Sequence, residues 1–170
     1  MKNIIALFIL TFVSVIGFNA CANENKPNIV FILADDLGWA DLPCYGNTFN
    51  EAPNLDKLAK AGIMFTNAYA ACPVCSPTRA SIQSGQYPAR VGITDFIPGH
   101  WRPFEEVIVP KNRTQYLPEE IVTLAESMKK AGYATGYFGK WHLGHSSQTS
   151  PLNQGYDKVH VHTGGGFYKP

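Results

Sequence analysis

The chain has 170 residues, of which 45% are hydrophobic and 16% are charged, and its formal net charge at pH 7 is +1. This composition is typical of a globular protein of about one domain and excludes a disordered chain. Because the sequence contains no cluster of Lys or Arg of the kind that binds nucleic acid, we expect no nucleic-acid partner.

The first 22 residues are predicted to be an export signal. Lys2 gives a short positive start, and the apolar run at 4–18 is too short to span a membrane as a mature helix. Residues 20–22 fit a small-x-small cleavage site, whereas Cys21 also fits a cysteine that is lipidated after cleavage before it. Both alternatives stay open. Either predicts an exported bacterial protein, periplasmic or lipid-anchored to the outer envelope, with membrane contact only through Cys21.

A continuous apolar run at 27–34 ends in Asp35 and Asp36. Continuous rather than alternating hydrophobicity predicts a strand that is buried on both faces, as in parallel sheets. Ligands of open α/β sheets gather at the carboxyl ends of the strands. Adjacent carboxylates repel each other unless a cation binds them, so this pair is a candidate metal site, with a turn or helix cap as the alternative.

The next elements are predicted to be a short helix and a strand. Asn54 fits a helix cap and Gly62 a helix stop, and the apolar stripe between them consists of Leu55, Leu58 and Ala59. Residues 63–69 then predict a strand.

A second helix is predicted directly after Cys75. Ser76 fits its N-cap, Pro77 its first helical position and Gly85 its stop. Unpaired backbone N–H groups and the helix dipole favour an anion near Cys75 and lower the pKa of a thiol there. Arg79 adds a cation about one turn further on. This pattern predicts a reactive side chain that faces a negatively charged group.

Prolines interrupt any helix or strand pattern over residues 91–116, which predicts a long loop. Such a loop either has a function or is a surface segment without one. It contains His-Trp-Arg at 100–102. Its segment 112–114 fits a glycosylation sequon, a pattern that is frequent by chance.

A third helix is predicted to begin with a capping box formed by Thr123 and Glu126 and to end at Gly132. Its expected buried stripe consists of Leu124, Met128 and Ala131.

The strand predicted at 133–138 leads to Lys140 and His142. If the backbone stays extended, these two side chains lie on one face and can reach one ligand. The alternation of strands and helices predicts an α/β fold with a mostly parallel sheet flanked by helices.

Residues 75–79 read Cys-Ser-Pro-Thr-Arg, and three further blocks accompany them in order, at 27–38, 53–59 and 132–142. Together they resemble the type I sulfatases of the alkaline-phosphatase-like superfamily, whose Cys-x-Pro-x-Arg cysteine is oxidised to formylglycine. The resemblance covers roughly residues 27 to 160. Members of that family run to several hundred residues, so it implies that residues 23–170 form the N-terminal part of a truncated catalytic domain.

The resemblance also implies a metal site. Asp35 and Asp36 would ligate a divalent cation, usually Ca²⁺ with Mg²⁺ as an alternative, together with an oxygen of the modified Cys75. The family's remaining metal ligands, and a further His and Lys, lie beyond position 170. We therefore expect the chain to be inactive alone.

Roles for three further residues follow from the same resemblance. Arg79 would stabilise the formylglycine hydrate, Lys140 would hold the sulfate, and His142 would hydrogen-bond to the hydrate and help to move its proton. The implied partners are a formylglycine-generating maturation enzyme and a sulfated small molecule or glycan. A sulfated carbohydrate is favoured by analogy, because the segment 100–102 is aromatic and basic.

Three other functions compete with a sulfatase. A phosphatase or phosphonate hydrolase of the same superfamily would share the fold and the metal. Cys72 and Cys75 form a C-x-x-C motif, as in thiol-disulfide oxidoreductases, but that function leaves the aspartates and Arg79 unexplained. The third is a non-catalytic exported binding protein. Gln83 and Phe138 depart from the family pattern and are interpreted as packing variation.

Overall fold

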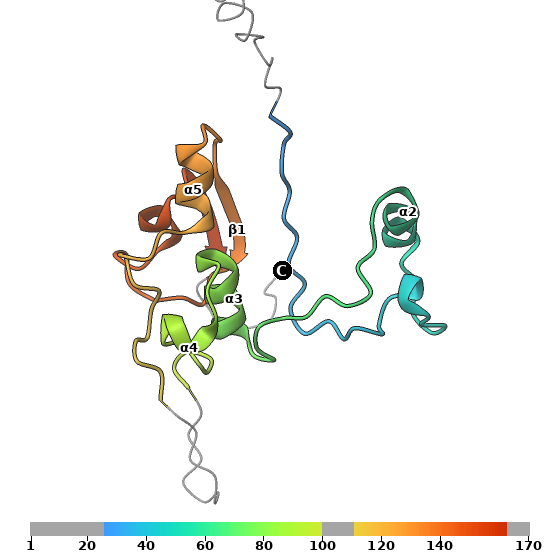
Figure 1. Cartoon of the computed structure of the whole chain (residues 1–170), viewed down its shortest axis with the longest axis horizontal. Helices are drawn as coiled ribbons and strands as arrows, with labels where there is room; N and C mark the ends of the chain where they lie inside the picture. Colours follow the sequence, from blue (N-terminus) through green and yellow to red (C-terminus); the bar gives the residue numbers. More distant parts are fainter. Residues whose placement is uncertain (1–25, 100–110, 163–170) are drawn as a thin grey trace, which may run out of the picture. The chain divides into compact units, whose positions relative to one another are not determined.

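The computed structural model describes residues 26–99 and 111–162 (Figure 1). The predicted export signal, Cys21 and the His-Trp-Arg segment at 100–102 lie outside these residues. The chain divides into two units, Met1–Leu37 and Gly38–Pro170, and each is described by itself. Within the described ranges, no helix is both long and apolar enough to cross a membrane.

The described part of the second unit begins with a series of short helices, which are followed by two strands with η2 between them. The elements are η1 (Pro43–Tyr45), α2 (Pro53–Ala61), α3 (Cys75–Ser84), α4 (Pro88–Val91), α5 (Leu124–Lys130), β1 (Gly136–Lys140), η2 (Pro151–Gln154) and β2 (Lys158–His162). The strands pair in parallel, with Phe138 opposite His160. Their connection carries η2, as a parallel pair requires a crossover rather than a hairpin.

A hydrophobic core forms among α3, α4 and the segment that follows β1. Its buried members are Ala80, Val91, Ile93, Ile97, Leu117, Trp141 and Leu143. Burial of one large apolar side chain contributes about 1.5–3 kcal/mol, so these contacts hold α3 against the end of β1. This packing positions the residues of the candidate site.

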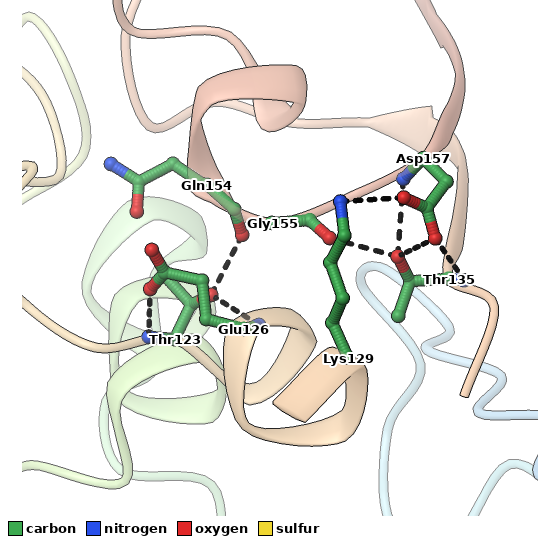
Figure 2. A network of polar contacts seen from close by, with 7 residues as sticks. All are labelled: Thr123, Glu126, Lys129, Thr135, Gln154, Gly155 and Asp157. Carbon is green, nitrogen blue, oxygen red and sulfur yellow. Dashed lines mark hydrogen bonds and ion pairs between the residues drawn. The ribbon is translucent and has the colours of Figure 1, made fainter. Parts of the chain in front are cut away.

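The predicted capping box of α5 is confirmed (Figure 2). The Thr123 hydroxyl accepts from the Glu126 N–H at 3.2 Å, and the Glu126 carboxylate accepts from the Thr123 N–H at 2.7 Å. Thr123 also donates to the carbonyl of Gln154 at 2.7 Å, which ties the helix start to η2.

A second cluster in Figure 2 joins α5 to the entrance of β2. Lys129 Nζ lies 2.6 Å from Asp157 Oδ1, and the other oxygen of Asp157 accepts from the Thr135 N–H at 2.9 Å. These hydrogen bonds, that of Lys129 first, lower the pKa of Asp157 to about 2. The carboxylate is therefore ionised at neutral pH.

The prediction of a buried strand at 27–34 is wrong for this structure. The segment forms no strand, and Val30 and Ile32 are 83% and 82% exposed. A doubly buried strand needs paired neighbours and a covering layer on each face, and the run has neither in the part of the chain that is described. The strand predicted at 63–69 is wrong for the same reason, since that segment is also exposed and unpaired.

Two predicted helix starts are also wrong, although both stops are confirmed. α2 begins at Pro53 with Ala52 as its cap, rather than being capped by Asn54, and Gly62 ends it. α3 is capped by Val74 without a side-chain bond, so Ser76 lies inside the first turn; Gly85 ends this helix in the left-handed region. The Ser76 hydroxyl is engaged elsewhere, as described below.

The predicted stripe of α5 is wrong, because Leu124 and Ala131 are exposed and Ala125 is the buried residue. β1 begins at Gly136, three residues later than predicted, and continues to Lys140. Its start is set by the pairing with β2.

Candidate functional site

The first turn of α3 presents Cys75. The residue is half-buried and its thiol is free, as are those of Cys44 and Cys72, so the described part of the chain holds no Cys72–Cys75 disulfide. The Thr78 hydroxyl donates to the carbonyl of Cys72 at 2.5 Å and accepts from its N–H at 3.2 Å. One side chain of α3 thus fixes the loop that leads into Cys75.

Arg79 connects α3 to the end of β1. Its side chain is 8% exposed, and its Nη1 donates to the carbonyl of Lys140 at 2.7 Å. The Tyr137 hydroxyl lies 3.5 Å from the same nitrogen and donates to the same carbonyl at 2.5 Å. The structure thus brings together two predicted site residues that are 61 positions apart.

His142 follows β1 in a left-handed conformation, with φ 56°. Its Nε2 lies 2.5 Å from the carbonyl of Ile97, and its Nδ1 is buried without a hydrogen-bond partner in the described part of the chain. Because a carbonyl only accepts, we assign the proton to Nε2, which leaves Nδ1 as an acceptor. Nδ1 is therefore the ring atom of His142 that remains able to accept a proton or a hydrogen bond.

The left-handed backbone shows that the chain does not stay extended from Lys140 to His142. The expectation that both residues share a strand face is therefore wrong. Burial lowers the pKa of His142, and the charges of Lys140 and Arg79 lower it further, whereas the bond to Ile97 opposes the shift. The imidazole is neutral at neutral pH, as a proton acceptor must be.

Sequence reasoning missed a buried hydrogen bond between Ser76 and Ile97, the residue whose carbonyl contacts His142. The Ser76 hydroxyl, which is fully buried, accepts from the N–H of Ile97 at 3.0 Å. Ile97 thus contacts α3 through its N–H and His142 through its carbonyl. No sequence pattern links positions 76, 97 and 142, because the contacts depend on how the loop packs.

The sequon at 112–114 also has a structural role that sequence reasoning missed. The Asn112 Oδ1 accepts from the N–H groups of Thr94 and Asp95, each at 2.8 Å, and its Nδ2 donates to the carbonyl of Asp95 at 2.9 Å. The amide nitrogen that would carry a glycan is therefore used to hold the segment that leads to Ile97.

Asp35 and Asp36 lie in the first unit and are described separately from Cys75. Both are exposed, and Asp36 adopts φ 59°. Two carboxylates are the donor type that a hard divalent cation prefers, so their chemistry fits such an ion. No group of three or more His, Cys, Asp or Glu side chains forms a metal cluster within the described ranges.

The sulfatase family model matches residues 27–166. The chain belongs to the sulfatase family. It is 40% identical over 150 residues to the N-acetylgalactosamine-6-sulfatase of Sus scrofa, which covers 88% of this chain and 28% of that protein. It is 44% identical over 122 residues to the N-acetylgalactosamine-6-O-sulfatase of Bacteroides thetaiotaomicron, with coverage of 72% and 22%.

Solved structures agree with this assignment. The crystal structure of Ps i-CgsB matches with a TM-score of 0.69 and 35% identity over 82% of this chain and 29% of that one. A structure from glycosaminoglycan metabolism of Bacteroides thetaiotaomicron matches with a TM-score of 0.66 and 38% identity, over 81% of this chain and 28% of that one. The predicted fold class, an α/β fold of the alkaline-phosphatase-like type present in part, is confirmed.

The chain spans less than a third of the length of these relatives. Sulfatases in general use a formylglycine and a divalent metal.

Proposed function

We propose that this chain is the N-terminal part of a sulfatase catalytic domain and that the protein hydrolyses the sulfate ester of a sulfated carbohydrate. The observation that carries the proposal is the sulfatase match over 27–166, within which Cys75 opens α3 and Arg79 is bonded to the end of β1. Relatives named for 6-sulfated N-acetylgalactosamine, and a neighbour solved with k-i-k-neocarrahexaose, support a carbohydrate substrate.

The chemistry proposed for Cys75 requires its oxidation to formylglycine by a maturation enzyme. As a hydrate, the aldehyde supplies one hydroxyl that attacks sulfur while the alcohol leaves, and a second whose deprotonation re-forms the aldehyde and expels sulfate. A thiolate has no such second group, so its sulfated form would not release sulfate.

The other residues act on charge and on protons. Arg79 and Lys140 offset the negative charge on the sulfuryl oxygens, and the buried guanidinium does so strongly because little water screens it. Nδ1 of neutral His142 accepts a proton, which the bond from Nε2 to Ile97 leaves possible. Asp35 and Asp36 would hold a divalent cation, with Ca²⁺ favoured and Mg²⁺ as the alternative, which would supply further charge neutralisation.

The export signal is also part of the proposal. Its apolar segment and Cys21 support export to the periplasm or lipid anchoring at the outer envelope of a bacterium. A sulfated glycan from outside the cell would meet an enzyme placed there.

The test uses protein expressed from the complete gene together with a formylglycine-generating enzyme. Mass spectrometry of the peptide that contains Cys75 should show conversion to the aldehyde. An aryl sulfate and a 6-sulfated N-acetylgalactosamine should then be hydrolysed, and the Cys75→Ala variant should be inactive. Faster turnover of an aryl phosphate than of either sulfate would assign the protein to the phosphatase or phosphonate hydrolase alternative. Unmodified Cys75 in active protein would exclude the proposed chemistry.

A further inference from the structure

The carbonyl of Lys140 accepts two hydrogen bonds at the end of β1. One comes from Arg79 Nη1 at 2.7 Å and the other from the Tyr137 hydroxyl at 2.5 Å. The hydroxyl also lies 3.5 Å from Arg79 Nη1, so all three groups meet at one point. Arg79 and Lys140, the two cations proposed to bind the sulfuryl group, are thus joined through the Lys140 carbonyl, to which Tyr137 also donates a hydrogen bond.

The Tyr137 ring is fixed from both sides. It packs edge-on against Trp141 and Tyr156, with ring centroids 5.1 Å apart in each pair. Trp141 is itself held, because its indole N–H donates to the carbonyl of Thr149 at 2.9 Å. The hydroxyl of Tyr137 therefore has a defined position rather than a choice of rotamers.

Tyr156 leads back to α3. Its hydroxyl donates to Oε1 of Gln83 at 2.9 Å, and Gln83 is a buried residue one turn after Arg79. Gln83 is one of the two positions where the chain departs from the family pattern, and a buried amide requires a hydrogen-bond partner. The departure is thus matched by Tyr156, within the aromatic cluster that supports Tyr137.

The phenol of Tyr137 is neutral, because burial raises its pKa despite the opposing charge of Arg79. A neutral phenol has one proton, and the geometry directs it to the carbonyl of Lys140. Its lone pairs remain on the side of Arg79, where they attract the guanidinium. Both effects hold the guanidinium and the Lys140 peptide in one relative orientation.

We propose that Tyr137 is a positioning residue of the anion site: its hydroxyl holds the Lys140 carbonyl that anchors Arg79, and so sets the direction from which both cations reach the anion. The proposal rests on the proposed function only for the identity of the anion as a sulfuryl group. Without the hydroxyl, the Lys140 carbonyl keeps its bond from Arg79 but loses the one from Tyr137, so the position of this carbonyl is less well fixed. The cations then spend less time in the orientation that binds the anion.

The test compares Tyr137→Phe with Tyr156→Phe in the full-length protein. Both variants lose one hydroxyl from the same aromatic cluster, but only Tyr137→Phe loses a bond at Lys140. Binding of inorganic sulfate is measured by calorimetry, kcat and KM with an aryl sulfate, and the unfolding temperature as a check on packing. Tyr137→Phe should weaken sulfate binding and lower kcat/KM about tenfold, which corresponds to one net hydrogen bond. Tyr156→Phe should change either value by less than about twofold, even where it lowers the unfolding temperature more.

Equal sulfate affinity in the wild-type protein and Tyr137→Phe would overturn the proposal. So would an equal loss in both variants, since that would show packing rather than positioning, or the absence of sulfate binding by the wild-type protein. If the wild-type protein binds sulfate but hydrolyses no sulfate ester, the proposed function fails, whereas the comparison of affinities still decides the role of Tyr137.

Discussion

Replacing Ser76 with alanine should loosen the Ile97 carbonyl on which His142 rests. The Ser76 hydroxyl accepts from the Ile97 N–H at 3.0 Å, and the two residues are 0% and 2% exposed. While the loop stays closed, water cannot replace the acceptor that the variant lacks. The N–H of Ile97 is therefore buried without a partner in Ser76→Ala, which costs about 1–3 kcal/mol.

Ser81 provides a matched control for this substitution. It lies in the same helix, and its hydroxyl is buried without a hydrogen-bond partner in the described part of the chain. Ser76→Ala and Ser81→Ala gain similar helix propensity, about 0.5 kcal/mol, so the difference between them reports the bond to Ile97. That difference should be at least the cost of the unsatisfied N–H, because Ser81→Ala also removes a buried hydroxyl that has no partner in the described part of the chain.

Hydrogen exchange measured by mass spectrometry on the peptide around Ile97 checks this prediction. Ser76→Ala should raise the exchange rate over wild type by about fivefold to about 100-fold, since a loss of about 1–3 kcal/mol of local stability corresponds to that range. Activity should fall with it, because His142 loses its fixed partner. Equal exchange in Ser76→Ala and Ser81→Ala would refute the reasoning, and unchanged activity despite faster exchange would show that His142 is held by other contacts.

Three further predictions address stability, pH and redox chemistry. Gly155→Ala should lower the free energy of unfolding in urea by about 1–3 kcal/mol more than Gly85→Ala. Both glycines have positive φ, but only a Cβ at position 155 would meet backbone, 2.6 Å from the Glu126 nitrogen of α5. Equal losses of stability in the two variants would contradict the steric argument. Burial lowers the pKa of His142, so as the pH falls below 6.5 the unfolded chain binds a proton at this residue more readily than the folded chain. The stability of the wild-type protein should therefore fall more over this range than that of His142→Gln. Melting temperatures that change with pH by the same amount in both proteins between pH 8 and pH 5 would exclude this. Cys72→Ala should leave sulfatase activity unchanged, since the Cys72 thiol is free. Loss of activity in protein whose Cys75 is still a thiol would support a dithiol role.

Features that depend on a few neighbouring residues could be predicted from the sequence. The capping box of Thr123 and the stops at Gly62 and Gly85 are confirmed, because each depends only on residues of its own helix and its two ends. The N-caps proposed for Asn54 and Ser76 are wrong, since α2 already begins at Pro53 and the Ser76 hydroxyl bonds elsewhere. In Ser76 the competing partner, Ile97, is 21 residues away.

The burial of side chains could not be predicted from the sequence as well as the residues at which helices stop. The apolar run at 27–34 fits a doubly buried strand, yet its side chains are exposed, because burial depends on neighbours that the run itself does not specify. The turn at His142 was missed for a related reason. Its left-handed backbone is accompanied by the bond to Ile97 and by a buried Trp141 before it, and neither contact is visible in a local pattern.

The residues proposed to bind the anion and those proposed to bind the metal lie in different units and depend on different contacts. The proposed anion-binding residues are positioned by contacts inside residues 75–142, since Arg79 is bonded to the end of β1 and His142 to the carbonyl of Ile97. The proposed metal ligands, Asp35 and Asp36, follow a run that has no strand partners in the described ranges. It follows that the proposed anion binding depends on contacts already described, whereas the proposed metal binding would benefit from pairing of the run at 27–34 with further strands.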